Sequence, residues 1–157
     1  MPTVREGAAR AADVLVVGGG PAGAAVATFL ARAGVAVVVL DKARFPREKP
    51  CAEYLSPEAS RLLHAMDVLP AVEAAGASQL RGMIVRAPNG EEIHGEFAAA
   101  HGFRGFRDRG LALRRPVLDA LLLEAARRAG AHVVDDPAHT VRELLRDGDG
   151  RVIGVRS

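Results

Sequence analysis

The fold of this chain is decided by the stretch Gly18-Gly19-Gly20-Pro21-Ala22-Gly23, which matches the pattern G-x-G-x-x-G. Asp13 to Val17, just before it, form the kind of short apolar run that is typical of a buried strand. Pro21 suits the first turn of a helix and Gly34 suits the position after its end, so a helix is predicted over about 21–33. The glycine-rich stretch is therefore a turn from a strand into a helix.

A second predicted strand completes a βαβ unit, in which each glycine of the turn has a physical role. Val35 to Leu40 are continuously apolar, as in a strand buried on both faces of a parallel sheet. In such a βαβ unit Gly18 permits the tight turn, Gly20 lets a pyrophosphate approach the backbone, and Gly23 lets the helix pack closely on the strand. The amides of the first helical turn face the anion. The whole turn is therefore predicted to bind a dinucleotide, through Gly18, Gly19, Gly20, Pro21, Ala22 and Gly23.

An acidic residue follows the second strand at the position expected for ribose recognition. Asp41 lies eighteen residues after Gly23, close to the offset at which a carboxylate accepts a hydrogen bond from a ribose hydroxyl. This negative charge disfavours a 2′-phosphate on the adenosine half. FAD and NAD both present ADP to such a site, so the turn and Asp41 leave the two cofactors open.

Composition excludes several other classes of protein. The chain has 157 residues, 49% of them hydrophobic and 25% charged, which predicts one soluble globular domain. A single cysteine excludes a disulfide framework, and the histidines show no metal-ligand spacing, so no metal is expected. The net charge of +2 on a mixed surface argues against nucleic acid as a partner. The uncharged run from Val14 to Ala31 is interrupted by glycine and proline, so neither a membrane span nor a signal peptide is expected, and the predicted location is cytoplasmic.

Periodicity and turn signals predict the remaining elements. Residues 43–55 and 98–110 are expected to be irregular. The clearest amphipathic helix begins at Pro116 and ends before Gly130. The other predicted elements are helices at about 57–66 and 70–75, a strand at 131–134, and two hairpins, 81–87 with 91–97 and 140–145 with 151–155.

Two further stretches carry a resemblance to a known family. Residues 44–57 read R-F-P-R-E-K-P-C-A-E-Y-L-S-P, and residues 113–119 read L-R-R-P-V-L-D, with Arg115 four positions before Asp119. Together with the glycine turn, they resemble the geranylgeranyl-reductase-like FAD-dependent oxidoreductases. These belong to a larger group that includes aromatic-ring hydroxylases and flavin-dependent halogenases. The shared stretch of that group reads F-P-R-x-K-x-C-G, and Ala52 stands where its glycine is usual.

The resemblance implies FAD as the cofactor and gives roles to several side chains. Arg115 would lie over the phosphates or the ribityl chain of FAD. Arg47 and Lys49 would neutralise phosphate or the charge of reduced flavin, although residue type alone also fits a solvated basic loop. Cys51 would lie beside the flavin ring, whereas a lone cysteine is more commonly a small buried apolar residue. Lys42 and Ala52 join Asp41 and the glycine turn as candidate cofactor-binding residues, and no catalytic residue is assigned.

The predicted fold class is α/β: a Rossmann-like parallel sheet that binds FAD, with part of an antiparallel substrate-side sheet. Residues 1–12 are expected to be flexible, residues 13–157 to form the FAD-binding domain, and about 79–100 to form the substrate-side hairpin. The chain ends on a predicted strand with no closing element, so it is interpreted as the N-terminal portion of a longer protein.

By resemblance, the predicted function is FAD-dependent reduction of an apolar, isoprenoid-like double bond, with the flavin as hydride carrier. NADPH and NADH are the candidate electron donors. The expected partner is a small apolar or aromatic substrate, with peripheral membrane contact if that substrate is a lipid. The alternatives are a flavin-dependent monooxygenase or halogenase acting on an aromatic or polyketide-like substrate, an NAD-dependent dehydrogenase, and a non-catalytic nucleotide-binding fragment.

Overall fold

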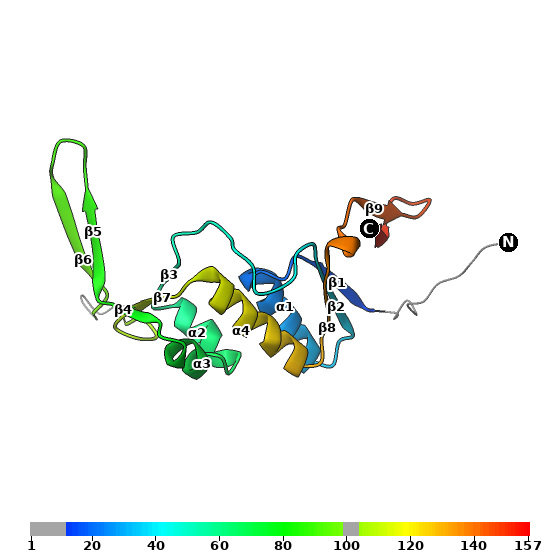
Figure 1. The fold of residues 1–157 in the computed structure, drawn as a ribbon, viewed down its shortest axis with the longest axis horizontal. Helices are drawn as coiled ribbons and strands as arrows, with labels where there is room; N and C mark the ends of the chain where they lie inside the picture. The colour runs from blue at the N-terminus through cyan, green and yellow to red at the C-terminus, as the bar shows by residue number, and fades with distance from the viewer. Residues whose placement is uncertain (1–11, 99–103) are drawn as a thin grey trace.

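The computed structural model describes residues 12–98 and 104–157. The N-terminal segment predicted to be flexible, residues 1–12, lies outside this description apart from Ala12. The elements run from blue to red along the chain in Figure 1. In chain order they are β1 (Val14–Val17), α1 (Pro21–Arg32), β2 (Val37–Asp41), β3 (Tyr54–Leu55), α2 (Ala59–Ala65), α3 (Leu69–Ala74), β4 (Ser78–Leu80), β5 (Gly82–Arg86), β6 (Glu92–Glu96), β7 (Gly110–Ala112), α4 (Arg115–Arg128), β8 (His132–Asp135), the 3₁₀ helix η1 (Pro137–His139), β9 (Glu143–Arg146) and β10 (Val152–Arg156).

A parallel sheet of order β1-β2-β8 forms one end of the molecule and confirms the predicted α/β class. Val14 pairs with Val37, and Val38 pairs with His132, so all three strands run in the same direction. β2 begins two residues later than predicted and includes Asp41. Gly18, Asp41 and Asp135 therefore follow or end their strands at the same edge of the sheet, which is where α/β proteins bind ligands.

The packing of α1 against α4 holds the glycine turn in place (Figure 1). Ala24 and Ala27 of α1 are fully buried, and their small side chains let the helices approach closely. A Cβ on Gly23 would lie 1.9 Å from the carbonyl oxygen of Gly18, so no side chain fits there. Gly18 itself has φ +103°, a conformation that favours glycine. Both glycines are thus required by the turn itself, as the sequence pattern predicts.

Sequence patterns did not predict a second, antiparallel sheet of order β3-β7-β4. Tyr54 pairs with Ala112, and Leu80 pairs with Gly110. The prediction of irregular structure at 43–55 and 98–110 is therefore wrong at the ends of these segments. Strands of two and three residues are too short to show an alternating pattern, and they form here because β7 lies between β3 and β4.

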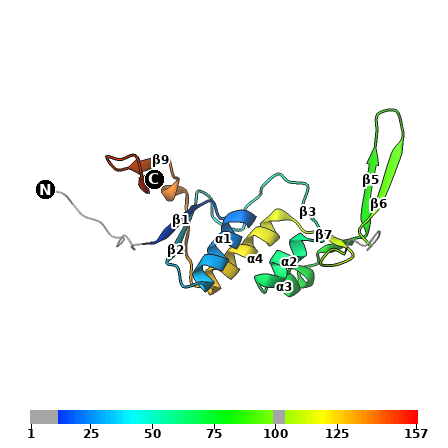
Figure 2. The ribbon, with the colours of Figure 1, turned by 180° about the vertical axis from the view of Figure 1, so that it is seen from behind.

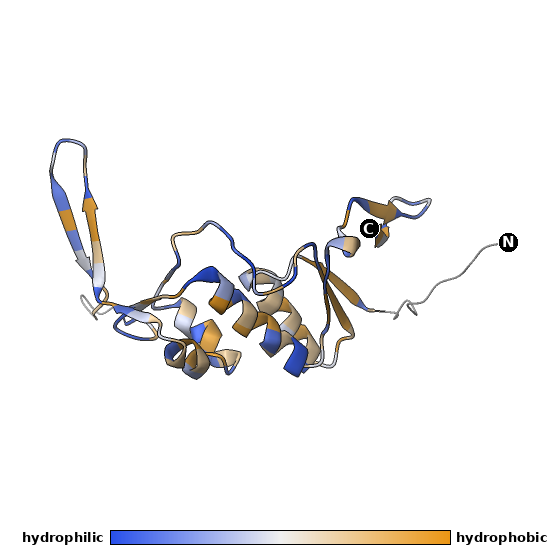
Figure 3. Ribbon diagram, in the orientation of Figure 1, coloured by the Kyte–Doolittle hydropathy of each residue, from blue (hydrophilic) through white to orange (hydrophobic). Residues whose placement is uncertain are grey.

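The structure contains two β-hairpins, β5–β6 and β9–β10, and both were predicted. β5–β6 projects away from the helices in both ribbon views (Figures 1 and 2). Every residue of β6 is exposed, and apolar residues recur along β5 (Figure 3). β9–β10 forms a separate two-stranded sheet, with Leu144 and Ile153 exposed. Within residues 12–98 and 104–157, none of the helices has the length and apolar character required to span a bilayer.

Candidate nucleotide-binding site

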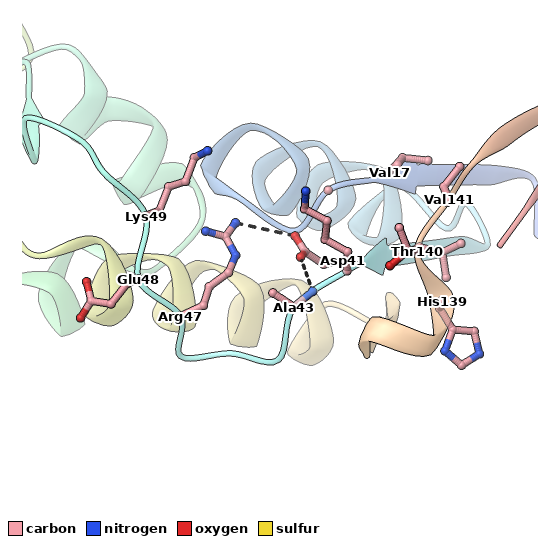
Figure 4. Close-up of a pocket in the computed structure, with 12 residues that line it drawn as sticks. Val17, Asp41, Ala43, Arg47, Glu48, Lys49, His139, Thr140 and Val141 are labelled. Atoms are coloured by element: carbon pink, nitrogen blue, oxygen red, sulfur yellow. Dashed lines mark hydrogen bonds and ion pairs between the residues drawn. The ribbon is translucent and has the colours of Figure 1, made fainter.

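A cavity of about 380 Å³ opens at the carboxyl ends of β1 and β2 (Figure 4). Val17 and Gly18 form one side, and Asp41 forms part of another. The segment 139–141, which begins at the last residue of η1, completes the wall. Lys42, Ala43, Arg47, Glu48 and Lys49 contribute from the loop after β2. The cavity therefore lies where the sequence predicts the adenosine half of a dinucleotide.

Asp41 links the glycine turn to the end of β2. Its Oδ2 accepts a hydrogen bond of 2.7 Å from the backbone N–H of Gly19, and its Oδ1 accepts one of 2.9 Å from that of Ala43. The residue is only 6% exposed, yet its carboxylate borders the cavity. Carboxylate oxygens have several lone pairs, so both backbone contacts leave room for a ribose hydroxyl as a further donor.

Two arginines and two aspartates form a charged cluster beside the turn. Arg47 lies with Nη2 3.7 Å from Oδ2 of Asp41 and Nη1 3.5 Å from Oδ2 of Asp119 (Figure 4 shows the Asp41 contact). Arg115 donates two hydrogen bonds to Asp119, of 2.7 Å from Nε and 2.8 Å from Nη2. This bidentate pair raises the pKa of Arg115 above its ordinary value. We refer to Asp41, Arg47, Arg115 and Asp119 as the charged cluster.

The charged cluster converges on Gly20, the middle glycine of the turn. A Cβ on Gly20 would lie 3.7 Å from Nη2 of Arg47 and 3.8 Å from Nη2 of Arg115, with no closer contact. Gly20 is also the N-cap of α1, so it precedes the helical amides that carry the positive end of the helix dipole. A space bordered by two guanidiniums and a helix N-terminus has the chemistry of a pyrophosphate site. The residues present therefore fit the diphosphate of FAD.

Cys51 lies beside Arg115. Its Sγ accepts a hydrogen bond of 3.4 Å from the backbone N–H of Glu53, and this contact lowers the pKa of the thiol, with a further contribution from Arg115. Glu53 has φ +60°, in the left-handed region that is uncommon outside glycine. Its Oε1 accepts a hydrogen bond of 3.3 Å from the backbone N–H of Arg115. The Cys51 loop is thereby attached to the start of α4.

The structure brings most of the predicted residues into two neighbouring groups. Gly18, Asp41, Lys42, Arg47 and Lys49 border the cavity. Gly20, Arg115 and Cys51 lie on the adjacent side, and Arg47 joins the two groups. Ala22 and Ala52 are exposed, and neither is among the residues that line the cavity.

Sequence reasoning gave no role in the site to Asp119, Glu53 or the segment 139–141. For Asp119 a signal was present, because an acid four residues after Arg115 on a helix is placed to form an ion pair. For the other two no local pattern was available. Across the described residues, no group of three or more histidine, cysteine, aspartate or glutamate side chains is arranged to hold a metal ion.

Comparisons with known proteins show the family of the chain. A family model described as FAD binding domain matches residues 11–155, and the chain belongs to that family. Menaquinone reductase of Mycobacterium tuberculosis is 56% identical over 55 residues, covering 35% of this chain and 14% of the relative. Digeranylgeranylglycerophospholipid reductase 2 of Methanopyrus kandleri is 38% identical over 146 residues, covering 91% of this chain and 32% of the relative.

A solved structure extends the similarity to three dimensions. The myxobacterial chondrochloren halogenase CndH, described as an FAD-dependent halogenase, superposes with a TM-score of 0.79 at 28% identity. The superposition covers 92% of this chain and 32% of the halogenase. The chain thus spans at most about a third of the length of these three proteins, and the part it spans contains the glycine turn and the charged cluster.

Proposed function

We propose that this chain is the dinucleotide-binding part of an FAD-dependent oxidoreductase that reduces an apolar, isoprenoid-like double bond. The observation that carries the proposal is the pair of guanidiniums, those of Arg47 and Arg115, that lie beside Gly20 at the start of α1. The two reductases reported above act, by their names, on a prenylated quinone and on a lipid with geranylgeranyl chains. That shared class of substrate favours reduction of an isoprenoid.

The residues of this chain would bind and orient the cofactor. The Gly20 region and the two guanidiniums would hold the pyrophosphate, while Asp41 would accept from a ribose hydroxyl and the cavity beside it would take the adenine. The bound flavin supplies hydride transfer, which no side chain can perform. Lys42 and Lys49 add positive charge at the cavity rim. NADPH or NADH is the proposed donor of the electrons.

A flavin-dependent monooxygenase or halogenase is the second candidate. The observation in its favour is the structural similarity to the halogenase CndH, which extends over nearly the whole chain. Both candidates require the same FAD site, so the contacts described here serve either reaction equally. The difference must reside in how substrate and oxygen reach the flavin.

FAD binding is tested with the chain and a glycine variant. The purified chain should keep its yellow flavin absorption after FAD is added and the sample is desalted. Gly20→Val should lower FAD affinity about 100-fold or more, because the side chain enters the space meant for pyrophosphate. The variant should still fold, since residue 20 has extended backbone (φ −70°, ψ −175°) and a Cβ there meets no atom closer than 3.7 Å. Gly148→Val, in open space in the β9–β10 turn, is the matched control.

The reaction is tested by product analysis with the protein that carries this chain. Under anaerobic conditions with NADPH or NADH, menaquinone and a geranylgeranyl lipid should yield products that are heavier by two hydrogens for each double bond reduced. A product that carries oxygen or halogen, formed only in air, would replace the reductase proposal with the second candidate. A protein that binds NAD but no flavin would overturn both.

A further inference from the structure

Asp119 is a completely buried carboxylate that the proposed FAD site does not yet use. It has 0% exposed surface and lies one turn into α4. Both of its oxygens accept from Arg115, and its Oδ2 also lies 3.5 Å from Nη1 of Arg47. A single carboxylate is therefore shared by two guanidiniums that come from different parts of the chain, the loop after β2 and the start of α4.

The two arginines are held very differently. Arg115 is fixed by its bidentate pair, with a side chain 14% exposed. For Arg47 no hydrogen bond is found within the described residues. Its guanidinium carbon lies 4.6 Å from the ring centroid of Phe45, and its two carboxylate contacts exceed 3.4 Å. The N–H groups of Arg47 are thus directed by charge and stacking and keep their donor capacity for an anion.

We propose that Asp119 is a positioning residue that holds Arg47 and Arg115 together beside Gly20 so that both guanidiniums meet a diphosphate. Two guanidiniums so close to one turn repel each other, and a shared carboxylate offsets this repulsion before the ligand arrives. Binding then requires little rearrangement of either side chain. This inference rests on the proposed FAD function and adds to it the group that organises the pyrophosphate contacts.

The direction in which loss of the Asp119 charge changes diphosphate binding distinguishes a positioning role from a purely electrostatic one. Asp119 carries negative charge near the space for an anion, so as a mere charge it would weaken diphosphate binding, and its removal would strengthen that binding. As a positioning residue it would have the opposite effect. Asp119→Asn keeps the size of the side chain, removes the charge, and leaves the carboxamide unable to accept from both arginines as the carboxylate does.

The test compares ADP with adenosine, because the two ligands differ by the diphosphate. Binding of each is measured by calorimetry with the wild-type chain, Asp119→Asn, and the control Glu124→Gln. Glu124 is an exposed acid on the same helix, paired with Arg127 at 3.7 Å. We expect Asp119→Asn to reduce the preference for ADP over adenosine about tenfold, a typical size for coupled charges, while adenosine affinity and the control stay within about twofold of wild type. In an Arg47→Met background the same substitution should have a smaller effect.

A second variant keeps the inference testable if Asp119→Asn does not fold. Arg115→Lys retains the positive charge and loses the bidentate contact, so the preference for ADP should fall as it does in Asp119→Asn. An unchanged or increased preference for ADP in either variant would overturn the positioning role while leaving the FAD proposal intact. Absence of ADP and FAD binding by the wild-type chain would instead overturn the proposed function. In that case NMR of the guanidinium groups tests the positioning role without a ligand. Increased motion of both arginines in Asp119→Asn would support that role, and increased motion of Arg115 alone would overturn it.

Discussion

The nucleotide-binding end and the β5–β6 hairpin differ in how far their apolar side chains are buried. Around the glycine turn, apolar groups such as Val39 and Ala24 are fully buried, and each charge of the charged cluster has an opposite charge within 4 Å. On the hairpin, Ile84 is 64% and Ile93 is 73% exposed. The first region therefore buries its apolar side chains and pairs its charges within the chain, whereas the second leaves apolar side chains exposed.

The register of the hairpin sharpens this contrast. Met83 pairs with Gly95 and Val85 pairs with Ile93, so these four residues share one face of the hairpin. The other face carries Ile84, Arg86, Glu92 and His94. The first face has no charged residue, and the second is mainly polar apart from Ile84; such a difference between faces is typical of a sheet with one side covered. Substitutions in the nucleotide-binding end should therefore lower stability or ligand affinity, whereas those on the hairpin should leave the stability of this chain nearly unchanged.

The largest effect is expected at Gly23. Gly23→Ala should destabilise the chain by about 3 kcal/mol, because the added Cβ would meet backbone and not a flexible side chain. Chemical denaturation followed by circular dichroism measures this loss. Gly148→Ala adds the same atom to the β9–β10 turn, where no atom lies within 4 Å, and should leave stability unchanged. Equal stabilities of the two variants would contradict the requirement for glycine at position 23.

The next largest effect is expected at Asp41. Asp41→Asn should lower ADP affinity by about 2 kcal/mol, because a charge-assisted hydrogen bond to the ribose is lost. The preference for ADP over 2′-deoxy-ADP should also decrease, which calorimetry with both ligands detects. Asn can still accept from the N–H of Gly19, so the turn itself should persist. If the variant discriminates between the two nucleotides as wild type does, Asp41 does not contact that hydroxyl.

A smaller effect concerns the reactivity of Cys51. Its lowered thiol pKa means that the thiolate, and with it the rate of alkylation by iodoacetamide, should increase at a lower pH than for an ordinary cysteine. Arg115→Met removes a positive charge that stabilises the thiolate, so the midpoint of the rate profile should move to higher pH. Arg114→Met, which removes the exposed neighbour paired with Glu48, should leave the midpoint in place. Coincident profiles for all three proteins would exclude an influence of Arg115.

The smallest effect is expected on the hairpin. Ile93→Thr should change the free energy of unfolding by less than about 0.5 kcal/mol, because the side chain is already exposed. Val39→Thr makes a similar change at a fully buried position of β2 and should cost about 2 kcal/mol by burying a hydroxyl. Denaturation of both variants compares the two regions directly. A large loss for Ile93→Thr would show that the hairpin packs against something in solution.

The sequence predicts what depends on local rules and misses what depends on distant pairing. The glycine turn, α1 and β2 were predictable because three glycines, Pro21 and Asp41 each have one local physical reason to be where they are. The β3-β7-β4 sheet was not, since its short strands exist only through pairing between residues such as Tyr54 and Ala112. Asp119 was part of the quoted stretch 113–119 but received no role, because the amphipathic pattern of α4 concerns apolar residues, whereas this acid is buried through its pair with Arg115.

The central claim is that the glycine turn and the two guanidiniums form one pyrophosphate site. A crystal structure of the chain with FAD bound tests it most directly. We expect the diphosphate at the start of α1, within hydrogen-bonding distance of both Arg47 and Arg115, with the ribose at Asp41 and the adenine in the cavity bordered by residues 139–141. A diphosphate located away from Gly20, or contacted by neither arginine, would contradict it.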